Sequence, residues 1–228
     1  MNKNFIVKVL NIGYVSKDIL LVRTQKPENY YFEPGGAVAI SINKPGWENK
    51  SRMFTFTNLN SDNFLEFAIK IYPEGRGVTL EISKLKKGDE LIIGMPLGTM
   101  KYETEGIFIA GGCGIAPFMA IFRDLYKHNK IGNNILFYSN KTEKDVIFKE
   151  ELQKMLGDNA HFFLTREKIE GYHYGRIDKE SIKKIVGTIN KQVYVCGPSE
   201  MIKNMNVIFH ELKKDKIITE KRENCELI

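Results

Sequence analysis

The hydrophobic pattern changes near residue 100, and this change constrains the fold more than any other feature of the chain. Before it, short apolar stretches rich in β-forming residues are separated by turn signals, for example at 33–36 and 88–89. After it, short apolar stretches alternate with helical patterns. Strands spaced by turns indicate a sandwich or barrel, whereas alternating strands and helices indicate a parallel sheet. We therefore predict an all-β domain over residues 1–99 and an α/β domain over residues 100–228.

The expected elements follow from the same pattern. In the first domain we expect strands over 5–10, 19–24, 37–42, 52–57, 65–72 and 90–93, with one short helix over 80–85. In the second domain we expect strands over 107–110, 135–139, 162–165 and 193–196. Helices are expected between and after them, over 118–128, 144–155, 179–186 and 199–214.

Composition and charge narrow the class of protein. The chain has 228 residues, of which 43% are hydrophobic and 27% charged, as in ordinary globular proteins, and this excludes a disordered, collagen-like or coiled-coil chain. The net charge of +6 suits an acidic protein partner or a phosphate-bearing ligand, although a solvated basic surface would explain it too. No run of five Lys or Arg residues and no RNA-binding or zinc-finger signature occurs, so we expect no nucleic-acid partner.

The cysteines and histidines predict neither a disulfide framework nor a metal site. The three cysteines, Cys113, Cys196 and Cys225, are odd in number and widely spaced, which favours a reducing compartment and gives no four-cysteine iron–sulfur site. The four histidines show no metal-ligand spacing. The N-terminus has no secretory apolar core, and glycines interrupt the uncharged run 106–122. We therefore expect a cytoplasmic protein without a membrane span.

The strongest local signal is the segment 111–117, GGCGIAP in one-letter code, which follows an expected strand and opens an expected helix. Glycines such as Gly112 and Gly114 let backbone amides approach a phosphate without a Cβ in the way. Pro117 fits a first helical turn, where its missing N–H costs nothing, and the helix N-terminus attracts an anion. A tight strand–helix connection without a ligand is the alternative, but the strand–turn–helix context favours a nucleotide phosphate site.

Positive charge follows the next two strands. A dinucleotide site usually has a carboxylate at the end of its second strand to bond the ribose 2′-hydroxyl. Here that strand is followed by Lys141, and the next strand by Arg166. These two side chains would suit a 2′-phosphate, unless each is simply a solvated cation.

Cys196, Gly197 and Pro198 stand at the end of the last expected strand, before a helix. Open α/β sheets bind ligands outside the carboxyl ends of their strands, so this segment is a candidate for the same site. A buried cysteine at a helix start would give the same sequence.

Two further segments in the first domain carry polar chemistry. Arg52, Met53, Phe54 and Thr55 place a cation, an aromatic ring and a hydroxyl on one strand, able to meet a phosphate, a flat ring and a ring nitrogen. The segment 75–79 is a second glycine turn that runs into the short helix, and it offers another phosphate cradle.

In this order the four signals resemble the ferredoxin–NADP reductase family over nearly the whole chain. The segment 52–55 is similar to the family's Arg-x-Tyr/Phe-Ser/Thr flavin motif, and Gly77, Val78 and Thr79 are similar to its flavin pyrophosphate turn. The segment 112–117 resembles the nicotinamide-nucleotide pyrophosphate loop, and 196–198 the motif beside the nicotinamide. The turns at 34–36 and 96–98 also match.

The resemblance implies an antiparallel β-barrel that binds FAD, followed by a parallel-sheet domain that binds NADP or NAD. It implies that Arg52 neutralises the FAD pyrophosphate, that Phe54 packs against the isoalloxazine and that the Thr55 hydroxyl lies near flavin N5. Cys196 would help to place the nicotinamide over N5. Thr55 and Cys196 are therefore the expected catalytic pair, while the cofactors carry the redox chemistry.

The chain departs from the family pattern at three places. Phe54 replaces the commoner tyrosine and lacks its hydroxyl, and Lys141 stands where NADP-specific members often carry arginine, so the planar fork is missing. The C-terminal segment 224–228 has no aromatic residue to shield a flavin.

The expected function is electron transfer from NAD(P)H through FAD to an acidic carrier, ferredoxin or flavodoxin, or the reverse. One alternative is an electron-relay subunit of a larger complex. Relatives of that sort usually add a C-terminal cysteine cluster for a two-iron centre, and only Cys225 stands there. Another alternative is reduction of a small molecule such as free flavin or a quinone. The sequence decides neither the nucleotide nor the oligomeric state.

Overall fold

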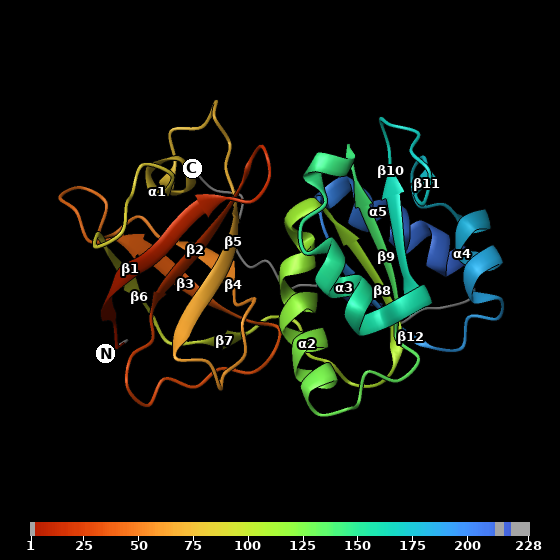
Figure 1. The fold of residues 1–228 in the computed structure, drawn as a ribbon, viewed down its shortest axis with the longest axis horizontal. Coiled ribbons are helices and arrows are strands. Elements are labelled where there is room, and N and C mark those ends of the chain that lie inside the picture. Colours follow the sequence, from red (N-terminus) through yellow and green to blue (C-terminus); the bar gives the residue numbers. More distant parts are fainter. Residues whose placement is uncertain (1–2, 213–216, 220–228) are drawn as a thin grey trace.

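A computed structural model of the chain describes residues 3–212 and 217–219, and these form two domains side by side (Figure 1). The first domain is an antiparallel sheet in the order β4-β3-β6-β1-β2-β5, with β7 paired to β3. A bridge between Phe56 and Phe67 brings the β4 end of the sheet to β5, so the sheet nearly closes on itself. This confirms the predicted antiparallel barrel.

The barrel elements have the following bounds: β1 Phe5–Tyr14, β2 Ile19–Gln25, β3 Gly36–Ile42, β4 Arg52–Thr55, β5 Phe64–Lys70, α1 Val78–Ile82, β6 Glu90–Ile93 and β7 Leu97–Gly98. All six predicted strands are present. The helix expected over 80–85 begins two residues earlier, where Val78 is buried in the barrel core. Strand β7 has only two residues and was not predicted.

The second domain has a six-stranded parallel sheet in the order β11-β10-β9-β8-β12-β13, flanked by helices (Figure 1). Its strands are β8 Gly106–Gly111, β9 Ile135–Asn140, β10 Ala160–Leu164, β11 His173–Tyr174, β12 Gln192–Cys196 and β13 Ile217–Thr219. Its α-helices are α2 Ala116–Lys127, α3 Lys149–Leu156, α4 Lys179–Val186 and α5 Ser199–Glu211. Short 3-10 helices lie at Gly112–Ile115 (η1), Glu143–Asp145 (η2) and Gly157–Asn159 (η3). The predicted α/β parallel sheet is confirmed.

The single helix expected over 144–155 is wrong. Thr142 and Asp145 close the short η2 in a capping box, and the chain then turns before α3 begins. Phe148 takes a left-handed conformation with φ of 59°, and Ile147 is buried in the core. Burial of Ile147 therefore breaks a helix that the local pattern favoured. The helix expected over 199–214 ends at Glu211, and residues 213–214 lie outside the described residues.

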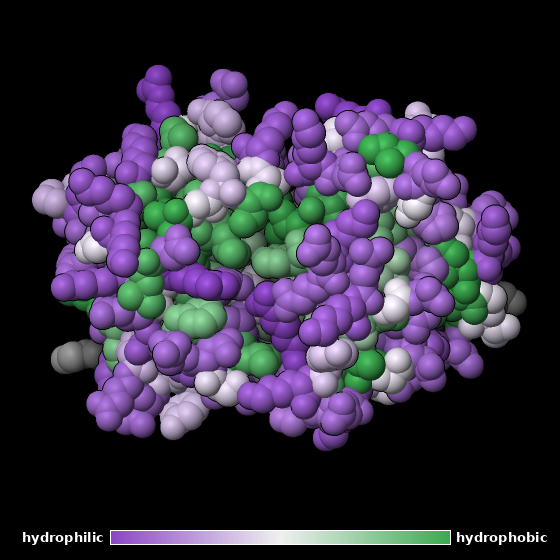
Figure 2. Space-filling view, viewed as in Figure 1, coloured by the Kyte–Doolittle hydropathy of each residue, from purple (hydrophilic) through white to green (hydrophobic). Residues whose placement is uncertain are grey.

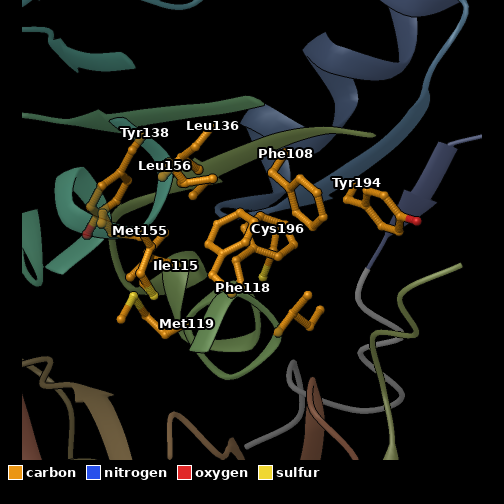
Figure 3. Close-up of a cluster of buried hydrophobic side chains, with 14 of the residues drawn as sticks. Phe108, Ile115, Phe118, Met119, Leu136, Tyr138, Met155, Leu156, Tyr194 and Cys196 are labelled. Carbon is orange, nitrogen blue, oxygen red and sulfur yellow. The ribbon is translucent and has the colours of Figure 1, made fainter. Parts of the chain in front are cut away.

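The parallel sheet is buried on both faces, as its near-continuous apolar strands require. Figure 3 shows one face, where Phe108 from β8 lies beside Tyr194 from β12 and above Phe118 from α2. The Phe108 and Tyr194 rings are stacked with centroids 4.4 Å apart. This packing fixes α2, and with it the turn that precedes α2, against the strands.

The predicted division at residue 99 falls in the segment that joins β7 to β8, and its exact position stays a prediction. The domains are not connected by this segment alone. Ile19 of β2 and Ala68 of β5 belong to the same buried cluster as Ile115 and Met119 of the second domain. The two domains therefore share apolar core along one seam.

Candidate functional site

The carboxyl ends of the central parallel strands meet at one edge of the sheet. Cys196 pairs with Ala110 across β12 and β8, and Gly111 pairs with Ser139 across β8 and β9. Parallel strands carry their C-terminal loops to the same side, where open α/β sheets bind ligands. The register therefore brings together the ends of the strands that precede the two predicted nucleotide segments.

Gly112 and Gly114 serve different purposes in the loop. Gly112 has φ of +53°, and a Cβ placed there would meet nothing within 4 Å. A Cβ on Gly114 would lie 2.2 Å from the Cys196 carbonyl oxygen and 2.8 Å from the Gly197 nitrogen. Gly114 thus permits contact between the loop and the end of β12, whereas Gly112 sets a left-handed turn beside open space.

The loop leads directly into α2. Residues 112–115 form η1, and α2 follows at Ala116 with Pro117 in its first turn, so the structure confirms the predicted strand–turn–helix. No side chain caps the N-terminus of α2. Its first backbone N–H groups and the positive end of its dipole lie at the edge where the strands end, which suits a phosphate group.

The structure also brings Lys141 and Arg166 together. The Arg166 backbone nitrogen donates to the Lys141 carbonyl oxygen at 2.9 Å, where β9 and β10 end. Both side chains are exposed. Two exposed cations at the edge where neighbouring strands end suit a phosphate group.

Sequence reasoning missed the carboxylates beside these cations. The Glu143 backbone nitrogen donates to Glu167 Oε2 at 2.9 Å, and the Tyr172 hydroxyl donates to Glu143 Oε1 at 2.9 Å. Glu167 therefore satisfies a backbone donor at the start of η2. Its position directly after Arg166 is a signal that the sequence offered.

On the barrel side, β4 carries the predicted flavin motif. All four of its residues are half-buried, whereas β3 beside it is almost fully buried. Arg52 Nη1 donates to the Ser51 carbonyl oxygen at 2.9 Å, and Phe54 packs against the edge of the barrel core. The cation, ring and hydroxyl of the predicted motif are thus only partly covered by the rest of the barrel, which suits residues that contact a ligand.

The second glycine turn ends at Gly77, which precedes α1. A Cβ on Gly77 would meet nothing within 4 Å, and no side chain caps the helix start. Val78 is buried and fixes the helix to the barrel, while Thr79 is half-buried. The open space beside Gly77 fits the backbone-lined cradle predicted for a pyrophosphate.

One further contact joins the nucleotide loop to the barrel. Cys113 Sγ donates to the Ala68 carbonyl oxygen of β5 at 3.0 Å. The loop that follows β8 therefore rests on a barrel strand as well as on the end of β12. The predicted nucleotide loop is therefore held against the barrel at the seam between the domains.

Comparison with known proteins identifies both domains. A family described as "Oxidoreductase FAD-binding domain" matches residues 6–102, and one described as "Oxidoreductase NAD-binding domain" matches residues 108–206. The chain is 27% identical over 212 residues to the reductase component of propane 2-monooxygenase from Rhodococcus jostii, covering 86% of this chain and 56% of that protein. It is 29% identical over 195 residues to NADH-cytochrome b5 reductase 1 from Laccaria bicolor, covering 78% and 62%.

A solved structure shares the fold. The ferredoxin NADP+ reductase from Neisseria gonorrhoeae, determined with bound FAD and NADP, superposes with a TM-score of 0.82 at 19% identity. The alignment covers 93% of this chain and 92% of that one. The chain spans 56% and 62% of the lengths of the two curated relatives named above.

The two domains and their order define a flavin- and pyridine-nucleotide-dependent oxidoreductase. These two domains make the chain a ferredoxin–NADP reductase-like oxidoreductase, as its motifs predicted, and the Neisseria structure shows the same fold. FAD and NAD(P) are the cofactors of its two domains, and the residues described above fit both.

The described residues contain neither a membrane-spanning helix nor a cluster of metal-ligating side chains. None of the helices there is both long and apolar enough to cross a membrane. No group of three or more His, Cys, Asp and Glu side chains suited to a metal ion occurs within residues 3–212 and 217–219. Cys225 and the segment 224–228 lie outside the described residues.

Proposed function

We propose that this chain takes electrons from NAD(P)H and passes them through FAD to a small acidic carrier protein, of the ferredoxin or flavodoxin kind. The observation that carries the proposal is the contact of Gly114 with the end of β12. It brings the two predicted nucleotide segments into contact, and Cys113 of the same loop contacts the flavin-binding barrel. FAD, when bound, supplies the redox chemistry, since flavins accept a hydride and release single electrons.

On the barrel, Arg52 neutralises the FAD pyrophosphate, and Gly77, Val78 and Thr79 offer it backbone N–H groups. Phe54 would pack against the isoalloxazine ring, and Met53 lies beside it on the same binding strand. The Thr55 hydroxyl would lie near flavin N5, the ring nitrogen at which FAD accepts a hydride. The half-buried state of β4 and the open space at Gly77 support these roles.

On the second domain, the loop from Gly112 to Pro117 would bind the nucleotide pyrophosphate through backbone N–H groups and the positive end of the α2 dipole. Cys196, Gly197 and Pro198 line the nicotinamide end. Cys196 is almost fully buried and its carbonyl lies beside Gly114, so a shift of either segment moves the other.

We assign NADPH as the preferred nucleotide. The support is the pairing of the Lys141 and Arg166 backbones, which places two exposed cations where β9 and β10 end. A 2′-phosphate would accept hydrogen bonds from both side chains, whereas the 2′-hydroxyl of NADH has no charge for them to neutralise.

The acceptor class follows from charge. The net charge of +6 favours encounter with an acidic carrier, and salt screens such attraction. Because the Debye length falls from about 10 Å at 0.1 M salt to about 3 Å at 1 M, turnover with ferredoxin or flavodoxin should fall steeply with ionic strength. Turnover with a neutral quinone should change little. A flat salt profile with both carriers would instead support a small-molecule reductase.

Stopped-flow reduction of the purified yellow protein by each nucleotide tests the proposal directly. We expect FAD bleaching with NADPH faster than with NADH. Colourless protein that neither FAD nor FMN restores, or a bound flavin that neither nucleotide reduces, would refute the proposed function.

A second candidate is the reductase component of a multi-protein oxygenase. It is supported by the similarity to the propane 2-monooxygenase reductase component, of which this chain spans 56%. The purified chain should then reduce ferricyanide with NAD(P)H but transfer no electrons to ferredoxin or flavodoxin.

A further inference from the structure

The seam between the domains contains a buried carboxylate that the proposed chemistry does not use. Glu66 lies in β5 with apolar residues on both sides of it in the strand, and its side chain is only 1% exposed. Its Oε1 accepts hydrogen bonds from Arg123 Nη1 at 2.9 Å and from the Thr57 hydroxyl at 2.8 Å. Its Oε2 accepts from Arg23 Nε at 2.7 Å. A carboxylate buried this deeply requires such partners.

Arg123 comes from the other domain, two turns along α2 from the nucleotide loop. Its Nη1 also donates to the Thr57 carbonyl oxygen at 2.7 Å. Its Nε and Nη2 donate to the two carboxylate oxygens of Glu151 in α3, at 2.6 and 2.7 Å, and so form a bidentate ion pair. The guanidinium therefore joins α2 and α3 on one side to β5 and the Thr57 backbone on the other, a geometry that the point charge of lysine cannot reproduce.

The pKa of Glu66 is consistent with a stable ion pair between Glu66 and Arg123. Burial alone would raise the pKa of Glu66, but the hydrogen bonds and charge of Arg123, together with those from Arg23 and Thr57, hold the pKa below its ordinary value. The Glu66 carboxylate is therefore ionised at neutral pH and fully paired. Charged and other hydrophilic residues fill the lower part of the seam in Figure 2, with hydrophobic residues above them.

The same barrel strand also holds the nucleotide loop. Cys113 Sγ donates to the Ala68 carbonyl oxygen, two residues beyond Glu66 on β5. The continuous segment η1–α2 is thus attached to β5 at two places, at the loop and at its third turn. Figure 1 shows α2 as the helix of the second domain that faces the barrel.

We propose that Arg123 is a positioning residue for hydride transfer. By clamping α2 to β5 through Glu66, it sets where the nucleotide loop at the start of α2 stands relative to the flavin strand β4. This inference rests on the proposed function. Each domain binds one of the two cofactors, so the position of one domain relative to the other sets the distance between the reacting atoms. A misplacement of about 1 Å can slow a reaction on the order of a hundredfold.

Glu66 provides a matched control, since it has one arginine partner from each domain. Arg123→Gln and Arg123→Lys remove or weaken the partner from the second domain, whereas Arg23→Gln removes the partner within the barrel. Both arginines bond the same carboxylate, at 2.9 and 2.7 Å. Only the Arg123 variants remove a hydrogen-bonded contact between the two domains.

The kinetic test measures single-turnover flavin reduction over a range of NADPH concentrations in FAD-loaded protein. We expect the limiting rate of Arg123→Gln to fall by about 10- to 100-fold, with a smaller loss for Arg123→Lys. The flavin spectrum, the NADPH dissociation constant and the oxidation of dithionite-reduced flavin by ferricyanide should stay near wild type. Arg23→Gln should keep the wild-type limiting rate. A wild-type rate for Arg123→Gln, or an equal loss in Arg23→Gln, overturns the inference.

A second measurement, amide hydrogen exchange, does not depend on the activity of the protein. Amide hydrogen exchange should rise in both β5 and α2 for Arg123→Gln, but only within the barrel for Arg23→Gln. Unchanged exchange in α2 overturns the inference even if the rate falls. A wild-type protein that neither nucleotide reduces would refute the proposed function instead, and the exchange arm would still report whether Arg123 clamps the domains.

Discussion

Gly114→Ala is the substitution for which the structure gives the sharpest expected outcome. The added Cβ would lie 2.2 Å from the Cys196 carbonyl oxygen, 2.6 Å from its carbon and 2.8 Å from the Gly197 nitrogen. These are backbone atoms at the end of a central strand and cannot rotate away. The loop and the strand end must part by roughly 1 Å to restore ordinary contact at 3.4 Å or more.

Such a separation affects both stability and rate. Overpacking of a well-packed site typically costs about 1–3 kcal/mol, so the second domain should unfold at lower temperature. A displacement of about 1 Å between the pyrophosphate loop and the nicotinamide segment should slow flavin reduction on the order of a hundredfold. Flavin content should not change, because the barrel residues of β4 and the Gly77 turn are not displaced.

Scanning fluorimetry and stopped-flow reduction by NADPH measure the two effects in one preparation. Gly13→Ala is the matched control, since it adds the same methyl group where nothing lies within 4 Å. It should leave the melting temperature and the rate near wild type. If Gly114→Ala reduces its flavin as fast as the wild type, the contact with β12 does not position the nucleotide and the reasoning is wrong.

Four other outcomes are expected. Arg52→Ala should weaken FAD binding by roughly 2–5 kcal/mol, because a pyrophosphate charge is left unpaired. The variant should therefore lose FAD during gel filtration, and full retention of FAD would contradict this. Cys196→Ala should slow single-turnover reduction with an almost unchanged flavin spectrum, and an unaltered rate with both nucleotides would exclude a role for its thiol. The Lys141→Ala, Arg166→Ala double variant should lose NADPH affinity while NADH affinity barely moves, and equal losses would show that neither side chain binds the 2′-phosphate. The folded protein holds the pKa of Glu66 below its ordinary value of 4.5. The ionised carboxylate therefore stabilises the fold above pH 4.5, and this stabilisation is lost as the pH falls through the lowered pKa. Acid unfolding of Glu66→Gln should therefore be less steep below pH 4.5 than that of the wild type.

The sequence predicted the structural features that are set by residues close together in the chain. The change of pattern near residue 100 separated the barrel from the parallel sheet, and the glycine loop before Pro117 marked a strand–turn–helix. Failures occurred where burial opposed the local pattern. The helix expected over 144–155 is interrupted at Phe148, because the chain turns there to bury Ile147.

By itself, the sequence determined the two domains, their order and the motifs that assign the family. Only the tertiary structure decided that Gly114 is needed for contact with Cys196 whereas Gly112 provides a left-handed turn. It also decided that Glu66 meets Arg123, 57 positions away. Local preferences act over a few residues, whereas such pairs exist only once strands and domains pack together, and a buried charge then takes the partner that packing brings to it.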